Sequence, residues 1–160
     1  MEALTTFVDT SAWLALLDAD EARHGEAAAA WRSLLERDTP LVTTNYVLVE
    51  TYALAQRRLG QAAVRALADD LLPVVEVEFV GSDAHDRAVA AIIAANRRDL
   101  SLVDAVSFDV MRRRGISRAF AFDRHFAEAG FGPAGPEQAL GRMQKRQPGS
   151  AAAVADPAMP

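Results

Sequence analysis

LTTFVDTSAWLALL, residues 4–17, is the stretch that decides the fold. Its first five residues form a short apolar run with a high propensity for β-structure, which predicts a strand over Leu4–Val8. Thr10 or Ser11 can then cap a helix that extends to the end of this stretch. Asp9 stands between the two elements, so the predicted strand leads into a carboxylate and then at once into a helix.

Strands and helices alternate along the rest of the chain. We expect further strands at about 41–43, 74–80 and 119–122, and helices at about 26–36, 45–59, 61–72, 82–95 and 101–114, before a loop and short helix at 123–129. Alternation of this kind predicts an α/β protein, with a three-layer α/β/α sandwich around a central, mostly parallel sheet.

The alternating pattern stops near Gly132. Residues 133–160 are rich in Gly, Pro, Ala and Gln, and we expect them to form a disordered tail behind one folded domain over residues 1–132. The sequence has no cysteine, which excludes disulfides, cysteine-ligated zinc and a cysteine nucleophile. Its acidic N-terminus is followed by no apolar run long enough for a signal peptide or a membrane span, so a cytoplasmic protein is expected.

The formal net charge of −5 argues, taken alone, against nucleic-acid binding. Arginines are nevertheless concentrated between residues 97 and 124, and this stretch becomes effectively basic if some of its aspartates neutralise a metal ion. We therefore consider four arginines as candidates for phosphate contact: Arg112, Arg113, Arg114 and Arg124. For the first three, an equally good explanation is that arginine near a helix C-terminus interacts favourably with the helix dipole.

Two aspartates directly follow hydrophobic runs that we predict to be strands. Asp9 follows the first strand, and Asp123 follows the strand at 119–122. In open parallel sheets, ligands bind outside the carboxyl ends of the strands, where active sites are usually built. Aspartate after a strand is also an ordinary turn or N-cap residue, and for either position alone that explanation is the better one.

Glu50 lies within YVLVETYALA, residues 46–55, a predicted helix that is apolar on nearly all sides. We expect such a helix to be buried. A buried carboxylate must find a cation or a hydrogen-bond donor, because leaving it unpaired is strongly unfavourable. A structural ion pair with an arginine is one explanation, and a functional role for Glu50 is the one we favour.

Asp104 lies in the first turn of the helix that Ser101 caps. The Ser101-x-x-Asp104 spacing imitates a capping box, which is a complete structural explanation for the aspartate. Asp104 also shares a helix face with Ser107 and Phe108, so it is expected to point toward the core. Asp109 falls on a different face and is expected to be solvated.

Taken together, the four acids can converge on one cleft: Asp9, Glu50, Asp104 and Asp123. Such a cluster repels itself strongly unless a cation bridges it. Hard oxygen ligands without histidine or cysteine favour Mg²⁺ or Mn²⁺. Metals held in this way activate water and stabilise charge on phosphate oxygens, so the cluster predicts metal-dependent phosphodiester hydrolysis.

Four blocks of the sequence resemble those of the PIN-domain ribonucleases and, within them, the VapC-like toxins of bacterial toxin–antitoxin pairs. The blocks are FVDTSA (7–12), VLVET (47–51), SLVDAVSF (101–108) and AFDRHF (121–126). Each block is weak alone, but the four occur in the order and spacing of that family over about residues 5–127. The resemblance therefore adds a family to the residue-level prediction.

The resemblance implies a metal-dependent endoribonuclease, with a PIN-like nuclease domain over residues 1–132. It implies that the four acids form the site, that Asp9 and Asp104 are the most direct ligands of Mg²⁺ (or Mn²⁺), and that Ser11 supports them. RNA as the substrate, a homodimer, and inhibition by a small cognate antitoxin protein are further implications. The preference for RNA comes from the resemblance, since a metal-activated water does not need the ribose 2′-hydroxyl.

Two other functions compete with the nuclease. An aspartate-based phosphatase usually has a second acid two residues after the first and a nearby lysine, whereas position 11 is serine and the single lysine, Lys145, lies in the predicted tail. The second alternative is a non-catalytic PIN-like module that binds protein. The intact set of four acids argues against this alternative. The three histidines, His24, His85 and His125, lack the spacing of a metal site and are expected to be structural, although His125 could contact the substrate.

Overall fold

A five-stranded sheet forms the centre of the computed structural model, which describes residues 4–135. The strands are β1 (Thr6–Val8), β2 (Leu41–Thr44), β3 (Glu76–Glu78), β4 (Arg118–Phe120) and β5 (Gly132–Pro133). They are arranged in the order β3-β2-β1-β4-β5, and each neighbouring pair is parallel. The predicted α/β class with a mostly parallel sheet is confirmed.

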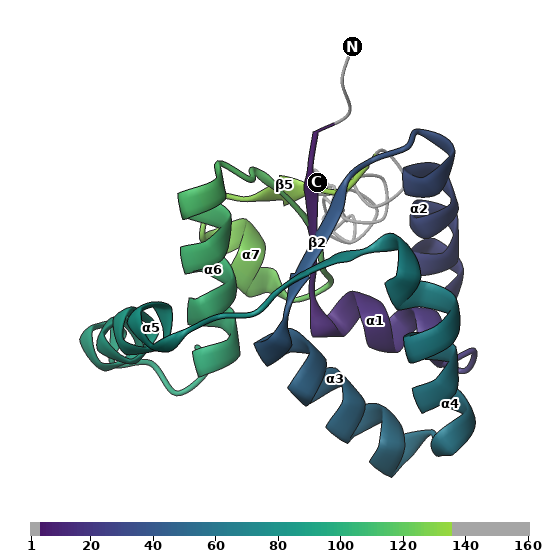
Figure 1. The fold of residues 1–160 in the computed structure, drawn as a ribbon, viewed down its shortest axis with the longest axis horizontal. Helices are drawn as coiled ribbons and strands as arrows, with labels where there is room; N and C mark the ends of the chain where they lie inside the picture. Colours follow the sequence, from purple (N-terminus) through teal and green to yellow (C-terminus); the bar gives the residue numbers. More distant parts are fainter. Residues whose placement is uncertain (1–3, 136–160) are drawn as a thin grey trace, which may run out of the picture.

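Helices cover both faces of the sheet. They are α1 (Thr10–Leu17), α2 (His24–Glu36), α3 (Asn45–Arg58), α4 (Gln61–Arg65), α5 (Ser82–Ala95), α6 (Leu102–Arg114) and α7 (Arg124–Glu128). In Figure 1, α1, α2 and α4 lie on one side, and α5, α6 and α7 on the other, which gives the three expected layers. Helix α3 crosses below the end of β2 and contacts both α1 and α6.

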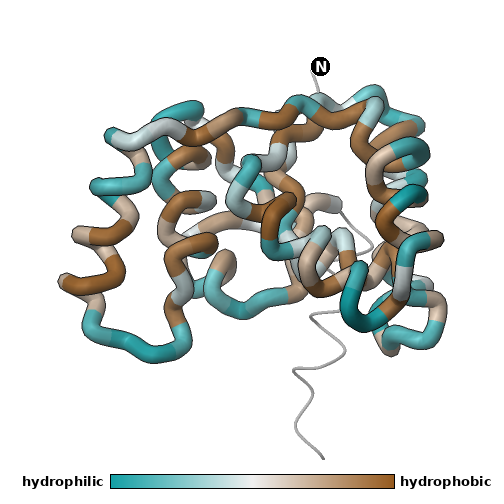
Figure 2. Tube along the Cα trace, turned by 60° about the horizontal axis from the view of Figure 1, so that its bottom comes forward, coloured by the Kyte–Doolittle hydropathy of each residue, from teal (hydrophilic) through white to brown (hydrophobic). Residues whose placement is uncertain are grey.

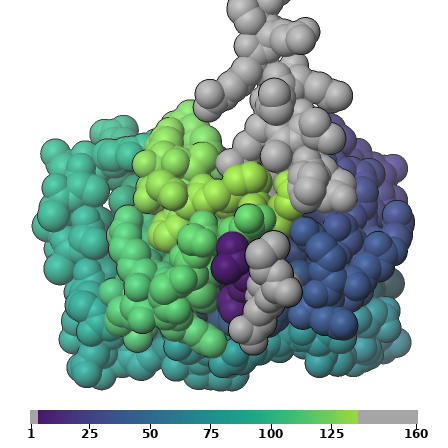
Figure 3. All heavy atoms as spheres, turned by 90° about the horizontal axis from the view of Figure 1, so that it is seen from above, coloured from purple at the N-terminus to yellow at the C-terminus, as the bar shows by residue number. Residues whose placement is uncertain are grey.

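Strand β1 is the central strand, and all three of its residues are buried. Phe7 pairs with Val42 of β2 on one side and with Ala119 of β4 on the other. Figure 3, which views the molecule from above, shows purple residues from the start of the chain against green residues from its second half. Burial on both faces explains why β1 is a continuous rather than an alternating apolar run.

The core is built from the two helix layers closing on the sheet. Phe7 of β1 stacks on Phe126 of α7 with ring centroids 6.2 Å apart, and Phe108 of α6 meets Phe126 edge-on at 5.0 Å. Full burial of side chains of this size contributes roughly 1.5–3 kcal/mol each. In Figure 2 the helices change between brown and teal along their length, as expected for helices with one face toward a core.

Two segments differ from the sequence prediction. The single helix expected at 61–72 is a short α4 followed by a π-helical stretch, Ala66–Leu71, and a 3₁₀ turn, Leu72–Val74. The edge strand β5 was not predicted, because two residues carry no periodic pattern and are recognised only by pairing with β4.

Two predictions concern the C-terminal end of residues 4–135 and the chain beyond it. The domain boundary placed at residue 132 falls inside β5, and the predicted tail lies outside the described residues from 136 onward. Within residues 4–135, no helix combines the length and apolar character needed to cross a membrane.

Candidate metal centre

The topology brings two of the predicted acids to the same edge of the sheet. Strands β1 and β4 are parallel neighbours, so their carboxyl ends lie side by side. Asp9 follows β1 directly, and its backbone amide donates to the carbonyl of Phe120 at the end of β4 (3.1 Å). Asp123 lies three residues after Phe120 and is the N-cap of α7.

Asp9 is the N-cap of α1, and only 4% of the residue is exposed. Its Oδ2 accepts hydrogen bonds from the amide of Ser11 (3.1 Å) and from the Ser11 hydroxyl (2.7 Å). Burial raises the pKa of Asp9 to about 7. The nearby charge of Asp104 also raises this pKa, while the hydrogen bonds from Ser11 lower it. A carboxylate in this state gains more from a bound cation than a solvated one does.

Asp104 approaches from the other side of the site, on the first turn of α6. The predicted capping box is present: the Asp104 amide donates to the Ser101 hydroxyl (3.0 Å), and the Ser101 amide donates to Asp104 Oδ2 (3.3 Å). Asp104 is nevertheless 7% exposed, and burial raises its pKa, with a further contribution from the charge of Asp123. The capping role and a functional role are therefore compatible.

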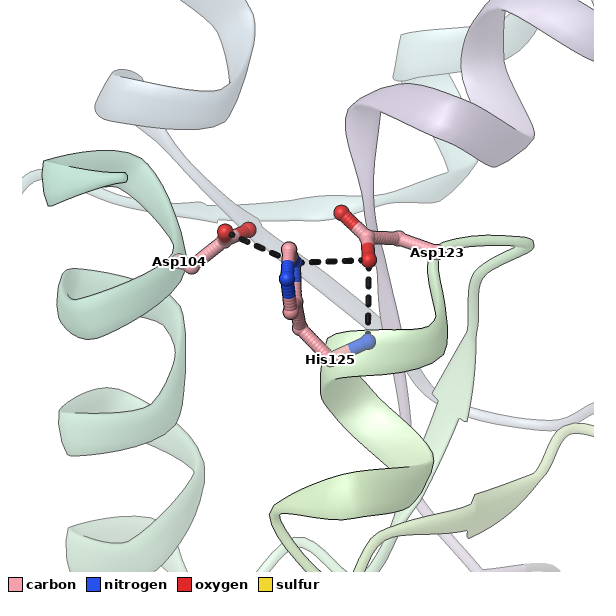
Figure 4. A group of neighbouring side chains, drawn as sticks. All are labelled: Asp104, Asp123 and His125. Atoms are coloured by element: carbon pink, nitrogen blue, oxygen red, sulfur yellow. Dashed lines mark hydrogen bonds and ion pairs between the residues drawn. The ribbon is translucent and has the colours of Figure 1, made fainter. Parts of the chain in front are cut away.

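Asp123 caps α7 by accepting from the amide of His125 at Oδ1 (2.9 Å). The ring of His125 then lies between two carboxylates, as Figure 4 shows. Its Nδ1 is 2.8 Å from Asp123 Oδ1 and 3.4 Å from Asp104 Oδ2, and its Nε2 is 3.2 Å from Asp99 Oδ2. Burial opposes protonation of the ring, but the surrounding carboxylates outweigh it and raise the pKa of His125.

His125 is the site residue that sequence reasoning set aside. The prediction considered the spacing of the three histidines from one another and found none typical of a metal site. The spacing that could have indicated the site is the one between His125 and an acid. Asp123 is the N-cap of α7, and His125 follows it by two residues. Ligand atoms of Asp104, Asp123 and His125 lie within 4.8 Å of one another, close enough to hold one cation together.

Glu50 differs from the prediction. Helix α3 is not buried on all sides: Val49 is 71% exposed, while Val47, Thr51 and Ala55 form the buried face. Glu50 is half-buried, and its side chain has no hydrogen bond or ion pair with any residue in the range 4–135. The expectation of a buried helix around it was wrong because apolar side chains on α3 also face solvent.

A contact beside Glu50 still relates α3 to the site. The hydroxyl of Thr51 lies 3.3 Å from that of Thr10, the residue after Asp9, and both are buried. The Thr10 hydroxyl also lies 3.4 Å from the carbonyl of Val47. These contacts place the middle of α3 against the start of α1, next to the first acid.

Three of the four candidate arginines lie at the far end of α6 from Asp104. With a rise of about 1.5 Å per residue, the helix separates the α-carbons of Arg112–Arg114 from that of Asp104 by roughly 12–15 Å. Arg114 forms an ion pair with Glu76 (2.9 Å), and Arg113 with Asp109 (2.9 Å). These ion pairs agree with a structural role for Arg113 and Arg114, whereas Arg112 lies over the Phe108 ring and lines a pocket together with His125.

Two further predictions concern neighbouring charges. Asp109, expected to be solvated, is half-buried in ion pairs with Arg113 and with Arg87 (3.1 Å). Arg124 is the candidate arginine that does lie beside the acids, directly after Asp123. Its guanidinium pairs with Asp99 at 3.0 Å.

Comparison with known proteins identifies close relatives. A family model described as "PIN domain" matches residues 6–132. The 23S rRNA-specific endonuclease VapC20 of Mycobacterium tuberculosis is 46% identical over 132 residues, which cover 82% of this chain and 98% of the relative. Its crystal structure, described as that of a sarcin-ricin loop cleaving toxin, aligns with a TM-score of 0.71 at 45% identity over 79% of this chain and 96% of that one.

The fold extends to a more distant structure. FitAcB from Neisseria gonorrhoeae aligns with a TM-score of 0.59 at 12% identity, covering 80% of this chain and 95% of that chain. At this identity the likeness is one of fold alone, and it agrees with the parallel sheet and helix layers described above.

Proposed function

Because this chain belongs to the PIN-domain family, we propose that it is a metal-dependent endoribonuclease that hydrolyses RNA phosphodiesters at the site containing Asp9, Asp104 and Asp123. The observation that carries the proposal is the meeting of acids from three elements at one edge of the sheet, where the pKa values of Asp9 and Asp104 are both raised. Carboxylates with perturbed pKa values cluster at functional sites.

The donor set fits a divalent cation. Oxygen atoms of Asp104 and Asp123 lie close together, and the Nδ1 of His125 is buried without a well-directed hydrogen bond. We propose Mg²⁺ or Mn²⁺ held chiefly by Asp9 and Asp104, since hard oxygen ligands suit both ions. When bound, such a cation supplies positive charge to the phosphate oxygens and polarises the attacking water.

The protein's own residues set up this chemistry. Ser11 holds one oxygen of Asp9 through its hydroxyl and its amide, which leaves the orientation of the carboxylate defined. Without metal, His125, whose raised pKa favours the protonated ring, offsets part of the negative charge of Asp104 and Asp123. With a cation bound to take over that charge, the neutral ring is favoured, and its Nδ1 could then be a ligand. We assign Glu50 as a fourth acid that acts from α3, and Arg124 and Arg112 as the arginines best able to contact a phosphate, because Arg112 lines a pocket with His125. Arg113 and Arg114 are held in ion pairs with Asp109 and Glu76.

Similarity to VapC20 supports a more specific assignment. That protein is described as a 23S rRNA-specific endonuclease and as a toxin that cleaves the sarcin-ricin loop. We propose that this chain also cuts ribosomal RNA, acts as the toxin of a toxin–antitoxin pair in the cytoplasm, forms a homodimer, and is inhibited by a small cognate antitoxin. Membership in a nuclease family and the intact acids favour catalysis over a purely protein-binding role.

The test is cleavage of a synthetic sarcin-ricin loop RNA and of intact ribosomal RNA, with Mg²⁺, with Mn²⁺ and with a chelator. We expect cleavage only with metal, and loss of cleavage in Asp9→Asn and Asp104→Asn. Asp109→Asn is the matched control, because Asp109 lies on the same helix as Asp104 but pairs with arginines at the surface. Equal cleavage by the wild type and the two site variants would trace the activity to a contaminant and refute the proposal.

A further inference from the structure

A pocket of about 390 Å³ adjoins the metal centre. It lies between α1, the segment that follows α1, the C-terminal end of α3 and the loop after β4. Its lining includes Ser11, Asp123, Phe122, Arg23 and Arg58. From this lining we propose that the pocket binds one nucleobase of the RNA strand, next to the phosphate that is cleaved. The inference rests on the proposed function.

The pocket and the metal centre share two residues. Asp123 contributes to both, and Ser11, which holds Asp9, also lines the pocket. Figure 4 shows the loop that carries Asp123 beside the purple ribbon of the chain's N-terminal part. A strand whose phosphate lies at the acids therefore passes the opening of the pocket, and a neighbouring nucleotide is the group best placed to enter it.

One wall of the pocket is a preformed stacking surface. The guanidinium of Arg23 lies 5.0 Å from the centroid of the Phe122 ring. Both partners are held: the Phe122 amide donates to the Ser11 hydroxyl (2.9 Å), and Arg23 Nη1 lies 3.6 Å from Glu26 Oε2. Aromatic rings and arginine planes are the groups on which proteins stack single-stranded bases.

The other lining groups suit a base better than a phosphate alone. Three carboxylates, those of Asp18, Glu21 and Asp123, line the pocket together with two arginines. Carboxylates repel a phosphate but accept hydrogen bonds from the amino groups of bases. Arg58 is exposed and has no ion-pair partner among residues 4–135, so it remains available for the phosphate attached to the bound nucleotide. The volume falls within the roughly 300–1,000 Å³ typical of pockets for small organic groups.

The experiment measures kcat/KM on a short RNA that the wild-type protein cleaves, at several salt concentrations. Phe122→Leu keeps an apolar side chain but removes the aromatic face, and we expect kcat/KM to fall about five- to a hundred-fold, as for other base–aromatic stacks. Arg58→Gln should lower it and reduce the salt dependence of log kcat/KM by about one. Because Arg58 is exposed, this variant is informative even if Phe122→Leu folds poorly.

Matched controls lie in the same helices. Arg57→Gln changes the same charge one residue earlier in α3, at an exposed position outside the pocket. Arg23→Gln removes the guanidinium that lies over the Phe122 ring and should also lower kcat/KM. Arg32→Gln is its control, because Arg32 is exposed on α2, the helix that Arg23 precedes. We expect both controls to cleave within about twofold of the wild type, in line with ordinary surface substitutions.

An abasic scan gives the decisive comparison. Removing one base at a time from the RNA should impair the wild type most at a single nucleotide beside the cut. At that nucleotide, Phe122→Leu should lose little more, since a shared interaction makes the two losses non-additive. Additive losses at every position would overturn the inference.

Other outcomes are separable. If Phe122→Leu, Arg23→Gln and Arg58→Gln cleave like the controls while Asp104→Asn is inactive, the pocket inference fails and the proposed nuclease stands. If those variants cleave normally but bind the antitoxin less tightly, the pocket serves a protein and the inference is again overturned. If the wild type cleaves no RNA with metal present, both the function and the inference fail.

Discussion

The backbone amide of Phe122 donates a hydrogen bond to the hydroxyl oxygen of Ser11, at 2.9 Å. The same hydroxyl donates its proton to Asp9, at 2.7 Å. One small side chain therefore joins the loop after β4 to the acid after β1, using both its donor and one of its acceptor lone pairs. This link fixes the first acid relative to the loop that carries the third, Asp123.

Replacing Ser11 tests this link. Ser11→Ala leaves the Phe122 amide without its partner, and we expect the free energy of unfolding to fall by about 1–3 kcal/mol. We also expect kcat for RNA cleavage to fall, because Asp9 loses the hydroxyl that orients it. Urea unfolding and initial rates measure the two effects. Ser117→Ala, at an exposed position, should change stability by less than about 0.5 kcal/mol; a Ser11→Ala protein equally unaffected would contradict the role assigned to this hydroxyl.

The raised pKa of Asp9 predicts how stability depends on pH without metal. The folded carboxyl has a pKa of about 7 against an ordinary value of 3.8, so the folded protein binds more protons between these values and loses stability as pH rises from about 4 to 7. The contribution of this group approaches about 1.4 kcal/mol per pH unit. His125, whose pKa is also raised, acts in the same direction as pH rises above 6.5.

Asp9→Asn isolates that contribution. In the presence of a chelator, the variant should be more stable than the wild type near pH 8, and its stability should fall less steeply between pH 5 and 7. Urea unfolding at each pH is the measurement. Identical slopes for the two proteins would show that the Asp9 carboxyl is not protonated in the folded, metal-free state.

His125 is expected to support metal binding, whether as a ligand or by orienting the acids. His125→Ala removes the ring that lies between Asp104 and Asp123, and we expect metal affinity to fall about 10- to 100-fold, the usual effect of losing a group that orients metal ligands. Isothermal titration with Mn²⁺ measures it. His85→Ala is the control, because the ring of His85 is hydrogen-bonded to the Tyr46 hydroxyl (2.6 Å) and not to an acid. Unchanged affinity in His125→Ala would exclude both roles.

Glu50 offers the sharpest separation of function from stability. Because it is half-buried and its side chain has no partner among residues 4–135, Glu50→Gln should leave the free energy of unfolding within about 0.5 kcal/mol of wild type. If it is the fourth acid, the same variant should lower metal-dependent cleavage at least tenfold. Glu36→Gln, exposed on α2, controls for the loss of one negative charge. Full activity in Glu50→Gln would remove this residue from the site.

Local sequence patterns were sufficient for much of the architecture. The alternation of apolar runs and capped helices predicted four of the five strands and the α/β class, because strand and helix periodicities are properties of neighbouring residues. Asp9 and Asp123 could be placed at one edge of the sheet for the same reason, since each follows a strand and the strands are parallel. The capping box at Ser101 was also readable from spacing alone.

Other features were decided only when distant segments packed together. Strand β5 exists because β4 offers it a partner, and the exposure of Val49 shows that an apolar residue faces solvent when no element covers it. The length of α6 separates Arg112–Arg114 from Asp104, and the turn into α7 brings His125 between two acids. Sequence by itself determined the order of the main strands and helices and the acids that follow the strands. Tertiary structure decided the exact ends of the elements, the edge strand β5 and which side chains meet, because pairing, burial and electrostatic coupling depend on neighbours that lie far away along the chain.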